Sequence, residues 1–185
     1  MSTDTEKIRL PLAKAERIAQ QIRAELAPWC AQIEIAGSIR RRRPDCGDID
    51  LVCLPKAPGC ITRILERCGK HARAVKRGEQ YCVFELANGF QLDLWLAHWG
   101  GPNPGTDLFE TEKEDIPGNF GVLLLARTGS AMFNVWIAQT AKAQGLHFNP
   151  HAGISRGKRI VAATEEPEIF SALGIDFIPP ELRER

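Results

Sequence analysis

Apolar residues recur at two different spacings in the first half of the chain, and each spacing predicts a different element. Between residues 12 and 26 they recur every three or four positions, which predicts an amphipathic helix that ends before Pro28. Alternating apolar residues then predict a short strand at 33–36 and a second strand at 48–54. Helical spacing returns after residue 60 and predicts a helix that ends at Gly69 and packs on the sheet.

The strongest local signal is a hairpin at Asn88 and Gly89, a residue pair typical of tight turns between antiparallel strands. The turn joins predicted strands at 81–87 and 90–97. The second of these strands is largely apolar but carries one carboxylate, Asp93. A carboxylate in such a strand has either a specific partner or a function.

The second half of the chain predicts a loop followed by a smaller mixed unit. Residues 99–120 are rich in Gly, Pro and acids, and so long a loop in a compact chain indicates a functional or mobile segment. The elements predicted after it are a helix at 121–128 stopped by Gly129, a helix from its N-cap Ser130 to about 143, a weak hairpin at 146–160, and a helix at 165–173 capped by Thr164.

Together these elements predict an α+β fold in two lobes. The first lobe, at 1–100, is a mixed sheet with helices that opens with the N-terminal helix. The lobe boundary is expected at 101–117, and a small α+β lobe at 118–185.

Two short motifs in the first lobe indicate a bound anion and a metal ion. Gly37 lets the backbone approach a ligand, and Ser38 is a predicted N-cap whose helical turn would point free amides at an anion. Asp48 and Asp50 share one face of their strand, and with Asp93 on a neighbouring strand they would form a three-carboxylate cluster. Such carboxylates stay jointly ionised beside a cation, and oxygen ligands favour Mg²⁺ or Mn²⁺. This combination favours a metal-bound nucleoside triphosphate.

Charge and composition exclude several classes of protein. The net charge is +1, with 16 basic and 12 acidic residues up to Asp93, which argues against tight non-specific nucleic-acid binding. No apolar run approaches the roughly 20 residues of a membrane span, and the N-terminus lacks the apolar core of a signal peptide, so we expect a cytoplasmic protein without a membrane partner. The six cysteines form no Cys-x-x-Cys pair, which favours reduced, buried thiols over a zinc site.

The order and spacing of these motifs resemble the active site of the family X DNA polymerases, within the polymerase-beta-like nucleotidyltransferase superfamily. The resemblance is carried by Gly37-Ser38, Arg41, Gly47-Asp48-Ile49-Asp50 and Asp93, and in the second lobe by Thr128-Gly129-Ser130, Phe133-Asn134 and Glu168-Ile169-Phe170. It implies that the first lobe is a nucleotidyltransferase palm and the second lobe a thumb.

The resemblance also implies a role for each matching residue. Asp48 and Asp50 would bridge two Mg²⁺ or Mn²⁺ ions, and Asp93 would ligate one of them and help to deprotonate a primer 3′-hydroxyl. The other residues would bind the nucleoside triphosphate: Gly37, Ser38, Arg41 and Gly47 at its phosphates, and Asn134 with the backbone of Thr128 and Gly129 at its base and sugar. Arg127 and Ser130 are further expected nucleotide contacts. The implied activity adds a (d)NMP to a DNA 3′-hydroxyl with release of pyrophosphate, in short-gap repair or low-fidelity synthesis.

The sequence departs from this family in several places. About 32 residues precede the strand at 33–36, so we expect no N-terminal lyase domain and weak DNA binding. We also expect a monomer. Ala126-Arg127 replaces an aromatic pair of the family, which leaves the choice between ribose and deoxyribose open. Two other functions also stay open: transfer to a small molecule, RNA or protein, and a non-catalytic module that binds DNA ends or gaps.

Some of these motifs also have a purely structural interpretation. Asp48 and Asp50 could be solvated acids that protect an edge strand, and the arginines at 40–43 could be a solvated basic run in which Arg41 is the best candidate for phosphate. His147 and His151 are separated by a helix-breaking Asn-Pro pair, so we expect loop histidines without a metal.

Overall fold

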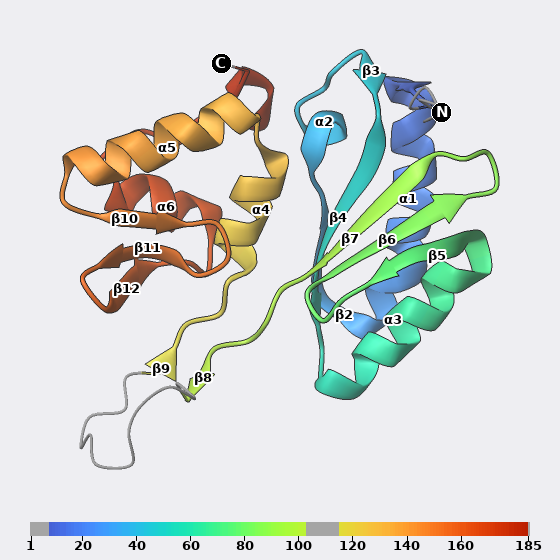
Figure 1. Ribbon diagram of the computed structural model, residues 1–185, viewed down its shortest axis with the longest axis horizontal. Coiled ribbons are helices and arrows are strands. Elements are labelled where there is room, and N and C mark those ends of the chain that lie inside the picture. The colour runs from blue at the N-terminus through green and yellow to red at the C-terminus, as the bar shows by residue number, and fades with distance from the viewer. Residues whose placement is uncertain (1–7, 103–114, 185) are drawn as a thin grey trace, which may run out of the picture.

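The structure is a computed structural model that describes residues 8–102 and 115–184. Its elements form two lobes, each with its own hydrophobic core (Figure 1). The N-terminal lobe ends at β8 Gly101–Pro102, which pairs with β9 Asp115–Ile116 at the start of the C-terminal lobe. Residues 103–114, most of the predicted lobe boundary, lie outside the described residues.

A five-stranded mixed sheet forms the centre of the N-terminal lobe. Its strands in spatial order are β2 Cys30–Ile35, β4 Asp48–Pro55, β7 Gln91–Leu96, β6 Tyr81–Leu86 and β5 Ala72–Arg77. Within this sheet β4 and β7 run parallel, and the other neighbouring strands run antiparallel. A separate antiparallel pair is formed by β1 Leu10–Pro11 and β3 Asp45–Cys46.

Two helices, α1 Leu12–Leu26 and α3 Pro58–His71, cover one face of this sheet (Figure 1). The buried positions of α1 recur every three or four residues, as the sequence pattern predicts. They are Ala15, Ala19, Ile22 and Leu26. They pack on the apolar side of the strands, which includes Ile49, Leu51 and Cys53 of β4 and Leu92, Leu94 and Leu96 of β7. A 3₁₀ turn, η1 Ala27–Trp29, leads from α1 into β2.

The C-terminal lobe combines three helices with a small antiparallel sheet. Its elements are α4 Phe120–Thr128, α5 Ala131–Ala143, β10 His147–Asn149, β11 Gly153–Arg156, β12 Arg159–Ala162, α6 Glu166–Ala172 and the 3₁₀ turn η2 Pro180–Leu182. Ser130 caps α5 as predicted, because its Oγ accepts a hydrogen bond from the amide of Phe133 at 3.3 Å. Phe133 then packs on Phe170 of α6 in the centre of the lobe.

The second face of the five-stranded sheet meets the C-terminal lobe. Val52 and Leu54 of β4 pack there against Phe120, Leu123 and Leu124 of α4, in a third apolar cluster that the two lobes share. The face therefore has an apolar half that holds the lobes together. Its polar half, which begins with Asp48 and Asp50, lies at the junction between the lobes.

The predicted α+β fold is confirmed, but several predicted element boundaries were wrong. The helix expected to end at Gly69 continues to His71, because Gly69 does not adopt the positive φ with which a glycine ends a helix. β5 was not predicted, since this edge strand is mostly exposed and basic. The weak hairpin at 146–160 is a three-stranded sheet.

The expected cap of the last helix was also wrong. Glu165 is the N-cap of α6, and it forms a capping box with Glu168. The Glu168 carboxylate accepts hydrogen bonds from the amides of Ala163, Thr164 and Glu165. A single carboxylate therefore satisfies three amides at the start of this helix.

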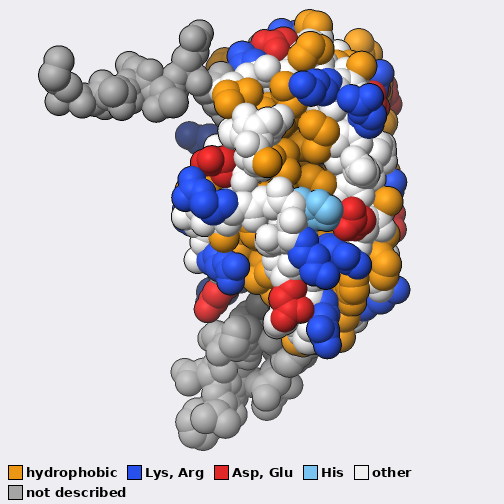
Figure 2. Space-filling view, turned by 90° about the vertical axis from the view of Figure 1, so that its right-hand side faces the viewer, with side chains coloured by type: hydrophobic (Ala, Val, Ile, Leu, Met, Phe, Trp, Pro, Cys, Tyr) orange, Lys and Arg blue, Asp and Glu red, His pale blue; other side chains and the backbone are white. Residues whose placement is uncertain are grey.

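The helical side of the N-terminal lobe has a surface of mixed charge. Figure 2 views the molecule from the right-hand side of Figure 1, and its coloured residues show basic and acidic side chains interspersed with apolar ones. That face offers no field of one sign to a polyanion. Among the described residues, no helix is long and apolar enough to cross a membrane.

Candidate active site

The three predicted carboxylates lie on one face of the sheet, the face opposite α1 and α3. Asp50 of β4 pairs directly with Asp93 of the parallel strand β7, and Asp48 lies two positions earlier on β4, opposite Gln91. Because side chains alternate along a strand, this register puts all three carboxylates on the same side. Their placement depends on the parallel pairing of two strands that are more than 40 residues apart.

Neighbouring side chains hold two of these carboxylates. Trp95 Nε1 donates to Asp50 Oδ1 at 3.2 Å. Asp93 accepts at both oxygens, from the Tyr81 hydroxyl at 2.9 Å and from Gln91 Nε2 at 2.6 Å. Asp93 is 8% exposed, so these hydrogen bonds replace much of the water it would otherwise contact.

The local electrostatics are those of a carboxylate site that favours a cation. Burial raises the pKa of Asp50 to about 7, and repulsion from Asp48 and Asp93 adds to the effect. Burial and the hydrogen bond to Asp93 also raise the pKa of Tyr81, so its hydroxyl stays a donor. A cation beside the three carboxylates would relieve their repulsion.

The chemistry of this donor set fits Mg²⁺ or Mn²⁺, since it supplies carboxylate oxygens without sulfur or imidazole. Among the described residues, no three His, Cys, Asp or Glu side chains are yet arranged as a coordination shell. The oxygens of Asp50 and Asp93 instead face the donors of Trp95, Tyr81 and Gln91. The predicted metal ligands are therefore close together but engaged with protein groups.

Gly37 forms the wall of the site beside Asp50. Its φ is +59°, and a methyl group on its Cα would overlap Asp50 Oδ2 and lie 3.0 Å from Asp50 Cγ. Only glycine combines this backbone conformation with so close an approach. Gly37 thus fixes where the Asp50 carboxylate can lie.

Replacing Gly37 by Ala is expected to displace the Asp50 carboxylate and reduce any activity of this site about 100-fold, because small misplacements of a reacting group have effects of this size. The left-handed conformation should also destabilise the protein by about 1–2 kcal/mol. Initial rates and urea unfolding would measure the two effects. Gly69→Ala is the matched control, since nothing lies within 4 Å of its added methyl. Full activity in Gly37→Ala would contradict the assigned contact.

Ser38 does not cap the helix that follows Gly37, contrary to expectation. The helix, α2 Gly37–Arg40, begins one residue earlier with Ala36 as N-cap, because the positive φ of Gly37 starts the turn there. The Ser38 Oγ is buried and has no hydrogen-bond partner among the described residues. Gly47, the other glycine predicted at the phosphates, is buried between β3 and β4.

The arginine run connects the two lobes. Arg40 Nη1 and Nη2 each donate to the Glu166 carboxylate at 2.8 Å, and Nη1 also donates to Thr128 Oγ1 at 2.7 Å. Arg41, the predicted phosphate ligand, donates to the Thr128 carbonyl and, through Nε, to Glu184 at 2.6 Å. Its side chain is only 15% exposed. Arg41 is thus engaged with the C-terminal lobe, and its role at a phosphate stays a prediction.

The predicted nucleotide-binding turn of the C-terminal lobe lies against this arginine run. Thr128 is fully buried, and Gly129 has a φ of +69° and ends α4. Asn134 donates from Nδ2 to the Ala126 carbonyl at 2.7 Å, while its Oδ1 has no partner among the described residues. Thr128 therefore connects the lobes, whereas the nucleotide-binding role of Asn134 stays a prediction.

Arg127 extends from the C-terminal lobe to the carboxylates. Its guanidinium lies 3.7 Å from the Trp95 ring centroid, and its charge favours the ionised form of Asp50. Nη2 lies 3.2 Å from His151 Nε2, and burial together with Arg127 lowers the pKa of that histidine. His151 is therefore a neutral acceptor near the site, although we expected a loop histidine without a role.

Four contributors to the site have roles that sequence reasoning missed: Tyr81, Gln91, Trp95 and His151. Gln91 and Trp95 share the strand face of Asp93, so the alternation of β7 was a usable signal for both. Tyr81 reaches the site through the β6–β7 register. Contact between His151 and Arg127 depends on tertiary structure, and no local pattern indicates it.

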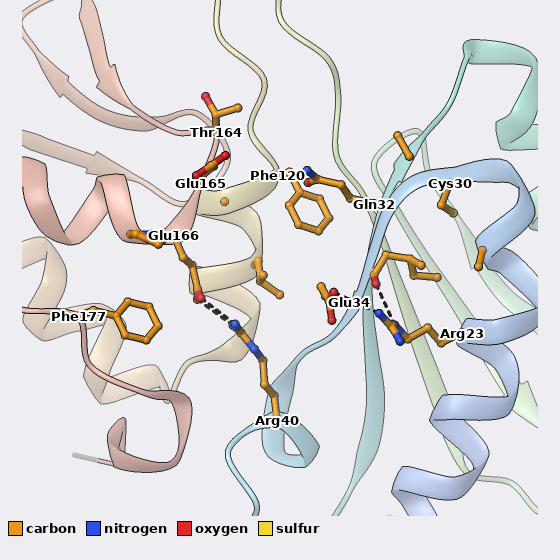
Figure 3. Close-up of a pocket in the computed structure, with 16 residues that line it drawn as sticks. Arg23, Cys30, Gln32, Glu34, Arg40, Phe120, Thr164, Glu165, Glu166 and Phe177 are labelled. Carbon is orange, nitrogen blue, oxygen red and sulfur yellow. Dashed lines mark hydrogen bonds and ion pairs between the residues drawn. The ribbon is translucent and has the colours of Figure 1, made fainter.

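A pocket of about 760 Å³ lies between β2 and the C-terminal lobe. Figure 3 shows Arg40 crossing toward Glu166 on one side of this pocket and Arg23 on the other. None of the three aspartates lines it. The pocket therefore belongs to the lobe junction and is distinct from the carboxylate site.

Comparisons with known proteins find similar sequences and a similar fold. Residues 123–184 match the family model described as DNA polymerase beta thumb. The chain is 24% identical over 180 residues to the DNA polymerase/3′-5′ exonuclease PolX of Bacillus subtilis (strain 168). This alignment covers 95% of the chain. It spans only 29% of the length of that curated relative.

Solved structures of Leishmania infantum polymerase beta have the same fold. The ternary P/T complex matches with a TM-score of 0.72 at 20% identity, and the ternary gap complex with 0.70 at 19%. Both matches cover 96% of this chain, and they cover 77% and 71% of the respective neighbours.

Proposed function

We propose that the chain, which is similar to family X polymerases in its thumb match, its curated relative and its fold, is a nucleotidyltransferase that adds a nucleotide from a nucleoside triphosphate to a DNA 3′-hydroxyl. In this proposal residues 1–100 are the palm, 118–185 the thumb and 101–117 the segment between them. The solved neighbours in ternary complexes support DNA as a partner. The acidic face of the sheet is the site of reaction.

The proposal rests on three of the four buried side-chain atoms that have no hydrogen-bond partner among the described residues: Ser38 Oγ, Arg127 Nε and Asn134 Oδ1. Ser38 follows the glycine that contacts Asp50, Arg127 interacts with the charge of Asp50, and Asn134 is bonded to the residue before Arg127. Buried polar groups are normally satisfied, so a polar ligand between them is expected. A nucleotide supplies acceptors for the first two atoms and a donor for the third.

The chain's own residues have distinct roles in the proposed reaction. Asp48, Asp50 and Asp93 would hold Mg²⁺ or Mn²⁺, which neutralises triphosphate charge and lowers the pKa of the attacking hydroxyl when bound. Ser38 and Arg127 would donate to phosphate oxygens, and Asp93 would accept the proton of the primer 3′-hydroxyl at a carboxylate oxygen. The new bond from the 3′-oxygen to the α-phosphorus forms as the bond to the bridging oxygen breaks, and pyrophosphate leaves.

Extension of a labelled DNA primer tests the proposal. The primer is offered alone, with a template, or at a one-nucleotide gap, and each is incubated with dNTP or rNTP and with Mg²⁺ or Mn²⁺. We expect extension by one or more nucleotides that requires the divalent ion. Equal extension of the three substrates would reject templated repair. No extension of any of them would reject DNA as the acceptor and leave a small molecule, RNA or protein.

DNA binding gives a second test at two salt concentrations. A protein that neutralises phosphates releases counterions, so its affinity falls as salt rises. With the small basic excess of the N-terminal half, we expect weak binding that falls further between 50 and 200 mM salt. Fluorescence anisotropy of a labelled gapped duplex would measure it. An affinity independent of salt would contradict contact with the DNA backbone.

A further inference from the structure

Trp95 lies in the middle of a layered stack beside the carboxylates. Its ring stacks on Tyr81 with centroids 3.9 Å apart and an interplanar angle of 16°. The Arg127 guanidinium lies 3.7 Å from the Trp95 ring centroid. Two groups cannot both lie so close to one ring on the same face, so Arg127 and Tyr81 occupy opposite faces of the indole. The stack therefore joins two strands of the sheet to α4 of the other lobe.

Each aromatic residue of this stack donates a hydrogen bond to a different carboxylate. Trp95 Nε1 donates to Asp50 and the Tyr81 hydroxyl donates to Asp93, at 3.2 and 2.9 Å. Asp50 and Asp93 are themselves direct neighbours across β4 and β7. The stack and the strand pairing thus form a closed frame in which neither carboxylate can rotate without breaking a contact.

This arrangement is not explained by packing alone. Trp95 and Tyr81 are only partly buried, and two phenylalanines would supply the same stacking area. Unlike phenylalanine, Trp95 and Tyr81 each supply a hydrogen-bond donor, to Asp50 and Asp93 respectively. Arg127 covers the indole from the C-terminal lobe, and His151 of the same lobe contacts its guanidinium. The frame is therefore completed only when the lobes are together.

We propose that Trp95 and Tyr81 are positioning residues that fix the rotation of the Asp50 and Asp93 carboxylates for a divalent cation, and that Arg127 clamps their stack when the lobes meet. The proposal deepens the proposed function, on which it rests for its catalytic readout. Groups that orient metal ligands in this way typically change metal affinity about 10- to 100-fold when they are removed. Trp95 and Tyr81 need not touch the substrate for this effect.

Two conservative variants, Trp95→Phe and Tyr81→Phe, test the proposal because each keeps a ring and removes one donor. Mn²⁺ is titrated into the full chain without nucleotide or DNA, and free Mn²⁺ is followed by electron paramagnetic resonance. We expect each variant to bind Mn²⁺ about 10- to 100-fold more weakly than the wild type. In primer extension we expect kcat to fall with Mn²⁺ affinity, while the KM for nucleotide changes less. Thermal unfolding reports whether each variant folds.

Trp29→Phe is the matched control. Trp29 also stacks on an arginine, Arg67 at 5.5 Å, but it lies in η1 on the helical side of the sheet. Its replacement should leave Mn²⁺ affinity unchanged, and an equal loss in this control would overturn the proposal. So would unchanged affinity in both test variants, or a wild type that binds no Mn²⁺. Weaker Mn²⁺ binding in the variants of a wild type that extends no primer would keep the proposal and reject the proposed function.

Arg127→Lys tests the clamp separately. Lysine keeps the charge but lacks the planar guanidinium that stacks on the indole. We expect it to weaken Mn²⁺ binding less than Trp95→Phe does, and to shift the fluorescence of Trp95. An unchanged spectrum would overturn the assignment of Arg127 as the clamp.

Discussion

Asp50→Asn is expected to abolish nucleotide addition, by about 1,000-fold or more, while making the folded protein more stable. Activity falls because Asp50 is the central carboxylate, paired with Asp93 and two positions from Asp48. Stability rises because burial, reinforced by the two neighbouring carboxylates, raises the pKa of Asp50 to about 7. An ionised Asp50 therefore opposes folding above neutral pH, and an amide does not.

The sign of this stability effect sets the conditions of the measurement. A carboxyl whose folded pKa is raised contributes stability that is present below its unfolded pKa, near 4, and is lost as pH rises through about 7. Urea unfolding at pH 8 with EDTA should therefore show Asp50→Asn to be more stable than the wild type. Asp45→Asn, at an exposed carboxylate bonded to Arg9, is the control. Lower stability in Asp50→Asn, or retained primer extension, would contradict the assignment.

Added Mg²⁺ should have different effects on the melting temperatures of the wild type and of Asp50→Asn. A ligand that binds only the folded state raises its stability by mass action. Because the cation relieves the repulsion among the carboxylates, we expect Mg²⁺ to raise the melting temperature of the wild type and to affect Asp50→Asn much less. Equal shifts in the two proteins would indicate binding elsewhere.

Glu166→Ala is expected to destabilise the protein by about 3–5 kcal/mol, the usual effect of removing one partner from a buried ion pair. Glu166 accepts from Arg183 Nη1 at 2.6 Å and from both terminal nitrogens of Arg40. Arg183 is fully buried, so its charge would lose its carboxylate partner inside the C-terminal lobe. Urea unfolding at pH 7 would measure the loss. Glu66→Gln, at an exposed ion pair, should change stability by less than about 1 kcal/mol.

The same cluster predicts a loss of stability in acid. Burial alone would raise the pKa of Glu166, but the hydrogen bonds and charges of Arg40 and Arg183 outweigh it and hold the pKa below its usual value. A depressed carboxyl pKa contributes stability that is present above the unfolded pKa and is lost as pH falls through the folded one. Wild-type stability should therefore fall more steeply below about pH 4 than that of Glu166→Gln. Parallel curves would contradict the pairing.

The carboxylate site could be predicted from sequence because it depends on short-range periodicity. Asp48 and Asp50 are two residues apart on one strand, and the motif order pointed to Asp93 on another. The pairing of β4 with β7 then brings Asp50 and Asp93 together. The spacing within each strand can be read locally, whereas we only assumed from the sequence that the two strands are neighbours, and their parallel pairing is a finding of the structure.

The hairpin shows where local signals stop. Asn88 and Gly89 predicted a two-residue turn, but Leu86 donates to Phe90, and the loop has three residues ending in Gly89 with a φ of +77°. The register of β6 on β7 therefore differs by one residue from the register of a two-residue turn. A shift of one residue exchanges the faces of one strand relative to the other. That difference is what puts Tyr81 opposite Trp95.

The lobe junction could not be predicted because its pairs are distant in sequence. Arg40 and Glu166 are 126 residues apart, and Arg41 and Glu184 are 143 apart. An arginine run predicts positive charge but does not indicate which anions it contacts. In the structure, Arg40 and Arg41 contact carboxylates of the C-terminal lobe.

Because α2 is short, the candidate site and the lobe junction are close together along the chain. It is a single turn, so Ser38, with its unpartnered hydroxyl, and Arg40, bonded to Glu166, belong to one small rigid piece. The two residues are two positions apart in this four-residue helix. A ligand that contacts the Ser38 hydroxyl would therefore lie within one helical turn of the Arg40–Glu166 pair, which joins the two lobes.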